Sequence, residues 1–139
     1  MSSSRRGLFR SAAQAAARAA IPDTPPPDPD APEPDALSPD EVERYSRQLV
    51  LESWGEAEQR RLGEASVLVV GAGALGSPVA AYLAGAGVGR LGIVDDDDVE
   101  LSNLHRQFLH LTPEIGAAKV HGAVARLQLL NPEVMVEPY

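Results

Sequence analysis

The sequence predicts an α/β fold in which a parallel sheet is built from alternating strands and helices. Short apolar runs of strand length alternate with longer segments of helical pattern. A glycine-rich turn lies between the first apolar run and the helix that follows it. The order of strand, helix, strand, helix, strand implies parallel pairing through right-handed crossovers.

The first 39 residues differ in composition from the rest of the chain. Residues 1–22 hold four arginines and no acidic residue, and residues 22–39 hold eight of the 12 prolines, interleaved with aspartate and glutamate. Such segments cannot bury apolar area, so we expect a disordered tail and an extended linker. An export signal in SRRGLFR is the alternative. The expected division is 1–39 for tail and linker and 40–139 for the organised domain.

Two helices are expected before the first strand. Ser38 is a candidate N-cap, Pro39 takes the first helical position, and Glu41 follows three residues after the cap. Residues 56–62 form a second, shorter helix that leads into Gly63.

The strands are expected at residues 66–70, 90–94 and 133–138. One helix runs from the glycine turn to about Ala86. Another covers residues 113–130, capped by Thr112 and ended by Asn131 and Pro132.

This pattern is the first β-α-β-α-β half of a doubly wound fold, which carries helices on both faces of its sheet. The usual strand order of that fold places the first strand in the middle of the sheet. If the chain ends at Tyr139, we expect this strand to be an exposed apolar edge.

Composition excludes several functions. The chain has no cysteine, so it has neither disulfides nor Cys-ligated zinc. No apolar run reaches the roughly 18 residues of a membrane span, and we expect a soluble protein without a membrane partner. All 20 acidic residues lie in residues 23–139. This part of the chain is therefore a poor candidate for binding nucleic acid, whose phosphates are neutralised by Lys and Arg.

The glycine turn follows the pattern G-x-G-x-x-G, filled by Gly71, Gly73 and Gly76. The first glycine permits a sharp turn, the second a close approach of a phosphate, and the third close packing of helix on strand. The helix N-terminus then presents N–H groups to an anion. A dinucleotide and ATP both satisfy this pattern, and packing alone also produces such turns.

Asp95 ends the second strand, where dinucleotide-binding folds place a carboxylate on the ribose hydroxyls. It is also the first of four consecutive aspartates, which can be a solvated turn. Adjacent residues of an extended segment point to opposite faces, so we expect no metal-ligand set among them.

A polar cluster follows this run. Arg106 is a forked donor suited to phosphate oxygens, Asn103 can hydrogen-bond phosphate, and Lys119 adds a point charge from the next helix. Together with the glycine turn, these residues favour a triphosphate site over a hydride-transfer site. We interpret His105 and His110 as bystanders.

Four segments resemble the N-terminal portion of the ThiF, MoeB and HesA family of adenylyltransferases, which are similar to ubiquitin-activating enzymes. They are ERYSRQLVL (43–51), residues 67–110 with the glycine turn and SNLHRQFLH, IGAAKV (115–120) and LNPEV (130–134). The resemblance runs from about residue 40 to 138.

The resemblance implies a Rossmann-like sheet that binds ATP with magnesium. We expect a cytoplasmic protein, because ATP and such carriers are found there. The reaction it implies is adenylation of the C-terminal glycine of a ubiquitin-like sulfur carrier, in molybdopterin or thiamine biosynthesis. Residues carried over by motif are Gly71, Gly73 and Gly76 near the nucleotide, Asp95 on the ribose, and Asn103, Arg106 and Lys119 on the phosphates. Arg47 matches an arginine that reaches across a homodimer to the partner's phosphates.

Other features of the family would lie beyond residue 139. They are a magnesium-binding aspartate, paired CxxC motifs for structural zinc, a cysteine that takes the carrier, and the surface for the carrier's tail. No metal ligand is therefore assigned in this chain, and we expect the 139-residue chain alone to be inactive in adenylation. The alternatives are an NAD- or FAD-binding domain of an oxidoreductase, and a non-catalytic module that pairs through the first strand.

Overall fold

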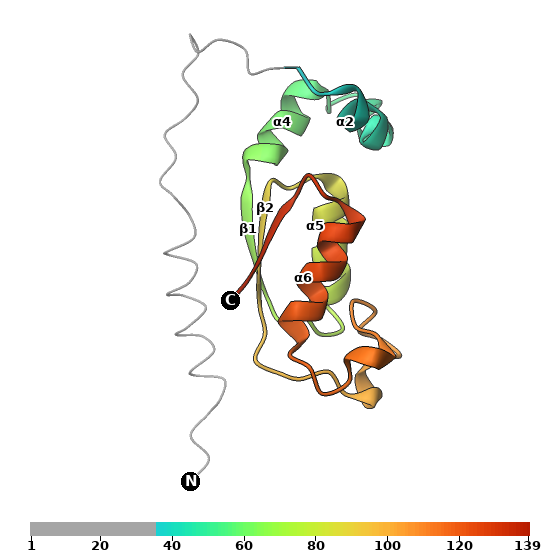
Figure 1. Ribbon diagram of the computed structural model, residues 1–139. Helices are drawn as coiled ribbons and strands as arrows, with labels where there is room; N and C mark the ends of the chain where they lie inside the picture. Colours follow the sequence, from blue (N-terminus) through green and yellow to red (C-terminus); the bar gives the residue numbers. More distant parts are fainter. Residues whose placement is uncertain (1–35) are drawn as a thin grey trace. The chain divides into compact units, whose positions relative to one another are not determined.

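The computed structural model describes residues 36–139 (Figure 1). The tail, most of the linker and the alternative export signal lie outside the described residues. Within them, the sheet has the strand order β1-β2-β3, with bounds Ser66–Val70, Arg90–Val94 and Met135–Pro138. Both pairs of neighbouring strands are parallel. The predicted bounds of the first two strands are confirmed, and the third is shorter than predicted.

Both crossover helices lie on one face of the sheet. Helix α5 (Gly76–Ala86) and helix α6 (Lys119–Leu130) pack against each other and against the strands. Two right-handed crossovers that step in the same direction, from β1 to β2 to β3, place their helices on the same side. Helices were predicted on both faces of the sheet. In the part of the chain that the structure describes, the two crossover helices cover one face.

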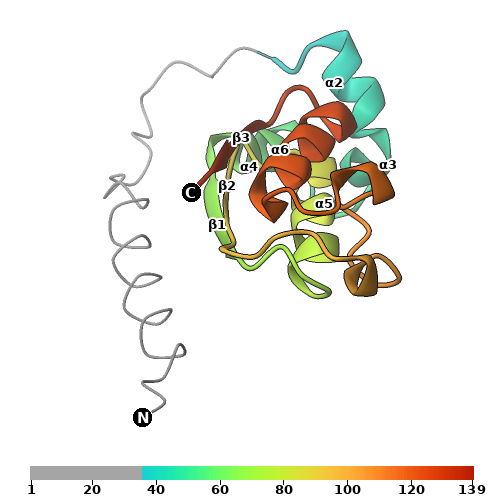
Figure 2. The ribbon, with the colours of Figure 1, turned by 60° about the horizontal axis from the view of Figure 1, so that its bottom comes forward.

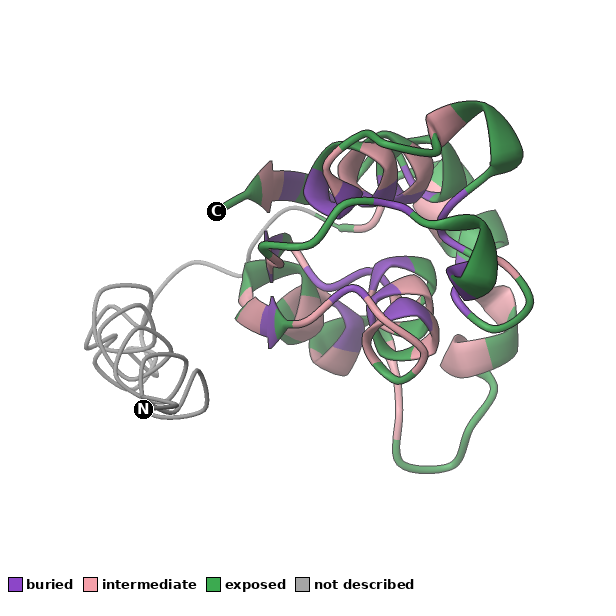
Figure 3. Cartoon of the chain, turned by 90° about the horizontal axis from the view of Figure 1, so that it is seen from below, coloured by how far each residue is buried: buried purple, intermediate pink, exposed green. Residues whose placement is uncertain are grey.

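The core lies between this face and the two helices, where the buried positions concentrate (Figure 3). Apolar side chains from strands, helices and adjoining loops form it: Val69, Ala72, Ala80, Ala84, Leu91, Ile93, Leu109, Val120, Ala123, Leu127, Val134 and Val136. None of the helices in residues 36–139 has the length and apolar character needed to cross a membrane.

The middle strand contains Gly92, and side chains from two sides occupy the space that a side chain at this position would take. A Cβ on Gly92 would lie 2.7 Å from Leu68 Cδ1 and 2.9 Å from the ring of Tyr139. Leu68 belongs to β1 and Tyr139 follows β3, so side chains from both neighbours of β2 meet over this position.

The predicted helix over 113–130 is wrong in its first part. Residues Thr112–Glu114 form a single 3-10 turn, η2, and α6 begins only at Lys119. Gly116 adopts a φ of +88°, outside the helical region, and its N–H donates to the Val99 carbonyl at 2.9 Å. The intervening residues therefore pair with the segment after β2. Thr112 consequently caps no long helix.

From residue 36 onward, three short helices precede β1: α2 (Pro39–Arg44), α3 (Ser46–Leu49) and α4 (Glu56–Glu64). The predicted cap is confirmed, because Ser38 Oγ accepts the Glu41 N–H at 3.2 Å and Glu41 accepts the Ser38 N–H at 2.8 Å.

These helices are held near the C-terminal ends of α5 and α6 (Figures 1 and 2). The buried amide of Asn131 donates to the Tyr45 hydroxyl at 2.9 Å and to the Ala84 carbonyl at 2.8 Å. Gln48 and Gln59 both donate to the Ala86 carbonyl. The glycine turn lies at the other end of α5.

Candidate functional site

The glycine turn joins β1 to α5 with a backbone geometry that requires glycine at two of its three glycine positions. Gly71 has a φ of +98°, in the left-handed region, and its N–H donates to the Val94 carbonyl at 2.6 Å. A Cβ on Gly76 would lie 1.6 Å from the Gly71 carbonyl oxygen. A Cβ on Gly73 would meet only the Gln107 side chain, at 3.8 Å. The fold itself thus requires Gly71 and Gly76, but not Gly73.

The start of α5 offers hydrogen-bond donors. The N–H groups of Gly73, Ala74 and Leu75 donate to no acceptor within residues 36–139. Leu75, at the N-cap, supplies no side-chain acceptor to this 11-residue helix. Unpaired N–H groups at a helix N-terminus attract an anion. The turn therefore fits a phosphate group.

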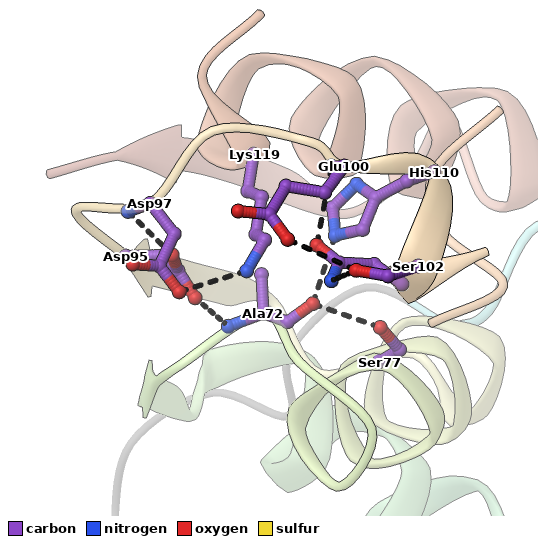
Figure 4. A network of polar contacts seen from close by, with 9 residues as sticks. Ala72, Ser77, Asp95, Asp97, Glu100, Ser102, His110 and Lys119 are labelled. Carbon is purple, nitrogen blue, oxygen red and sulfur yellow. Dashed lines mark hydrogen bonds and ion pairs between the residues drawn. The ribbon is translucent and has the colours of Figure 1, made fainter. Parts of the chain in front are cut away.

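Asp95 lies directly after β2, beside the glycine turn (Figure 4). Its Oδ2 accepts the N–H of Ala72 at 2.6 Å, and its Oδ1 accepts the N–H of Asp97 at 2.9 Å. Each carboxylate oxygen retains one lone pair, so a ribose hydroxyl could still donate to it. Asp95 thus anchors the turn whether or not it also holds a ribose.

The acidic run does not alternate as an extended segment would. The Asp97 N–H folds back onto the Asp95 carboxylate, and single oxygens of Asp95, Asp96 and Asp97 lie within 4.8 Å of one another. The predicted opposite orientation of neighbouring aspartates is wrong, because strand geometry does not continue past Val94, where β2 ends.

Lys119 is the first residue of α6, and only 4% of it is exposed. Its Nζ donates to Asp97 Oδ2 at 2.9 Å, and its N–H donates to the Asp97 carbonyl at 3.0 Å. A buried ammonium group requires such a partner. The contacts bring Lys119, Asp97, Asp95 and the glycine turn into one network (Figure 4).

Asn103 and Arg106 lie in the loop around the 3-10 helix η1 (Leu101–Asn103). Asn103 is buried, and its Oδ1 accepts the Glu100 N–H at 3.2 Å. Arg106 is exposed, and its Nη1 donates to the Ser102 carbonyl at 2.9 Å. Neither side chain hydrogen-bonds to the network of Lys119 and Asp95 in the described residues.

Arg47 lies apart from the other predicted site residues. It is exposed on α3, next to Gln48, which donates to the carbonyl of Ala86 at the last residue of α5. The glycine turn precedes the first residue of the same helix. The structure therefore does not bring Arg47 to the glycine turn of its own chain.

Two side chains without an assigned role also contact the glycine turn. Ser77 Oγ donates to the Ala72 carbonyl at 3.0 Å, and His110 Nε2 lies 2.9 Å from the same oxygen. Ser77 directly follows the third glycine, which is a signal in the sequence. No spacing rule connects position 110 to the turn, because an irregular loop brings it there.

Comparison with known proteins identifies related sequences. Residues 45–139 match the model of the ThiF family. A sulfur carrier protein adenylyltransferase of Thermus thermophilus is 56% identical over 99 residues, 71% of this chain and 36% of the relative. The adenylyltransferase and sulfurtransferase MOCS3 of Bos taurus is 59% identical over 99 residues, 71% of this chain and 22% of the relative. The chain thus spans a minor part of the length of these relatives.

Solved structures agree on the fold. PaaA superposes with a TM-score of 0.70 at 32% identity, covering 99% of this chain and 43% of PaaA. Escherichia coli MccB, solved with ATP, superposes with a TM-score of 0.64 at 31% identity, covering 69% of this chain and 30% of MccB.

Proposed function

This chain belongs to the ThiF family, and we propose that it carries the nucleotide-binding half of an adenylyltransferase. The substrate we propose is the C-terminal glycine of a ubiquitin-like sulfur carrier. The observation that carries the proposal is the network that joins the glycine turn, Asp95 and the buried Lys119. It places an ammonium group and unpaired N–H donors around the end of β2, where a triphosphate needs both.

In the proposed reaction, a carboxylate oxygen of the carrier attacks the α-phosphorus of ATP. A bond forms between that oxygen and phosphorus, the bond to the bridging oxygen breaks, and pyrophosphate leaves with its electron pair. The carrier itself supplies the nucleophile, so no serine or cysteine is needed. Negative charge grows on the phosphate oxygens, where fixed cations stabilise the transition state more than the ground state. Arg106 and Lys119 are the residues we assign to this task.

Lys119 must change partners to do so. Its ammonium group is bound to Asp97, which is 69% exposed at its side chain. A phosphate oxygen carries charge comparable to the carboxylate and can replace it with little cost to the buried ammonium. Magnesium would enter with ATP, and we assign it no ligand in this chain. We propose that the reaction takes place in the cytoplasm, because ATP and sulfur carriers are found there.

We further propose a homodimer in which Arg47 acts on the partner's nucleotide. Leu75, Val79 and Tyr82 form an apolar stripe on α5, with exposed fractions of 83%, 49% and 81%. A two-fold axis perpendicular to α5 and passing through this stripe would pair α5 antiparallel with its copy. Within one copy, α3 and the glycine turn lie at opposite ends of α5. Antiparallel pairing would therefore bring α3 of one copy, with Arg47, to the glycine turn of the other.

The first test compares ATP with NAD by titrating the ¹⁵N-labelled chain and following amide resonances. We expect ATP to shift resonances of the glycine turn, and NAD to leave them in place. Arg106→Ala should weaken ATP binding about tenfold, because a hydrogen bond to a charged group is lost. Arg61→Ala, on α4, is the matched control and should bind ATP as the wild type does. Equal shifts with NAD would instead support the oxidoreductase alternative.

A further inference from the structure

Both backbone polar groups of Ala72 are bound by side chains, which come from three parts of the chain (Figure 4). Its N–H donates to Asp95, after β2, at 2.6 Å. Its carbonyl is bound by Ser77 of α5 at 3.0 Å and by His110 of the loop before η2 at 2.9 Å. Ala72, Ser77 and His110 are all buried. No ligand is needed for this arrangement, so it belongs to the protein itself.

His110 is the unusual member of this group. A carbonyl oxygen only accepts hydrogen bonds, so His110 Nε2 carries the proton. The other ring nitrogen, Nδ1, is buried without a partner within residues 36–139. An apolar side chain would fill this space without leaving a polar atom unpaired. Packing alone therefore does not account for a histidine at position 110.

The hydrogen bonds to the Ala72 carbonyl fix a neighbouring donor. The carbonyl of Ala72 and the N–H of Gly73 belong to one peptide plane, and in a trans peptide they point in opposite directions. Ser77 and His110 bind the carbonyl in the protein interior. The Gly73 N–H must then point away from them, and it has no acceptor in the described part of the chain.

Without these hydrogen bonds, the peptide plane between Ala72 and Gly73 could rotate by about 180°. Rotating it changes ψ of Ala72 and φ of Gly73, and glycine accepts both signs of φ. A reversed plane would present a carbonyl oxygen to the phosphate in place of a donor. Both lone pairs of the Ala72 carbonyl are occupied, one by Ser77 and one by His110. The pair opposes that rotation more strongly than either residue alone.

We propose that His110 is a positioning residue for nucleotide binding, which acts with Ser77 through the Ala72 carbonyl to aim the Gly73 N–H at a phosphate of the nucleotide. This inference rests on the proposed function, because it assumes that the glycine turn binds ATP.

The test measures the affinities of ATP and adenosine for four proteins by amide resonance titration. They are the wild type, His110→Met, His110→Gln, and His121→Met as a control at an exposed histidine of α6. Methionine fills the space without a donor, whereas the glutamine amide can donate from near the position of Nε2. We expect His110→Met to weaken ATP about tenfold and leave adenosine unchanged, because only the phosphates use the Gly73 N–H. His110→Gln should bind ATP within about threefold of the wild type.

Three results would overturn the role of His110: His110→Met binding ATP as the wild type does, an equal loss of ATP and adenosine, or a loss of ATP in His110→Gln as large as in His110→Met. If His110→Met does not fold, tripolyphosphate is titrated into the wild type. The Gly73 amide should then show the largest shift of the turn, and an unmoved Gly73 amide would refute the inference. A wild type that binds neither ATP nor tripolyphosphate would instead refute the proposed function.

Discussion

At the glycine turn, Gly73 and Gly76 lack side chains for different reasons. A Cβ on Gly76 would overlap the Gly71 carbonyl oxygen, whereas a Cβ on Gly73 would make an ordinary contact. Gly76→Ala should therefore destabilise the fold by about 3 kcal/mol, the upper range for overpacking. Gly73→Ala should leave the unfolding free energy nearly unchanged and weaken ATP binding, because its methyl group occupies the approach of the phosphate. Denaturant unfolding and ATP titration of both variants check this contrast.

The sequence predicted part of the site at this scale. The spacing of the glycines and the place of Asp95 after a strand follow from local rules, and the structure brings them together. The pairing of Lys119 with Asp97 and the contact of His110 with Ala72 were not predicted. Both depend on how a loop without regular hydrogen bonding folds back, and no periodic pattern encodes that path.

Among the elements, the strands were the most predictable. Each is a short apolar run next to a turn, and β1 and β2 have the expected bounds. The start of α6 was missed because Thr112 and Pro113 are an ordinary helix start by composition. Gly116 has a backbone conformation in the left-handed region, and the helix therefore ends after a single turn. Residue type alone does not reveal which sign of φ a glycine adopts.

Asn131 links the helices before β1 to the two crossover helices. Its side chain is fully buried and bonded to Tyr45 and Ala84. Asn131→Leu should cost about 1–3 kcal/mol, because it leaves the Ala84 carbonyl buried with one bond fewer and removes the bond to Tyr45. Tyr45→Phe removes only one bond and should cost about 0.5–1.5 kcal/mol. Urea unfolding of both variants gives the two values, and equal losses would contradict this ranking.

The ion pair between β2 and β3 makes stability depend on pH. Arg90 donates to Glu137 at 2.8 Å and 2.9 Å, and this bond, followed by that from Tyr139, holds the pKa of Glu137 below its usual 4.5. A carboxyl group with a lowered folded-state pKa stabilises the fold above its unfolded pKa. That contribution is lost as the pH falls through the lowered value.

Glu137→Gln should therefore be less stable than the wild type at pH 7, and the difference should shrink below about pH 4.5. The pair is partly exposed, so high salt should also reduce the difference. Unfolding free energies measured between pH 3 and pH 7 test the sign. A difference that grows toward low pH would contradict it.

For the whole molecule, the apolar stripe on α5 predicts self-association. Tyr82→Asp places a charge in the proposed interface and should shift the chain to monomer in sedimentation velocity. Leu129→Asp, at an equally exposed position of α6, is the control and should leave association unchanged. A monomeric wild type, or equal effects of both changes, would exclude this surface.

The empty position at Gly92 also constrains the order in which mutations can accumulate. Leu68 and Tyr139 fill the space that a side chain at 92 would take. A single change of Gly92 to Ala meets both neighbours, whereas the same change after Leu68 has become Val meets one obstacle fewer. Positions 68 and 92 are therefore coupled across the sheet: alanine at 92 requires the Leu68 and Tyr139 side chains to shift, and valine at 68 removes the nearer of these two contacts.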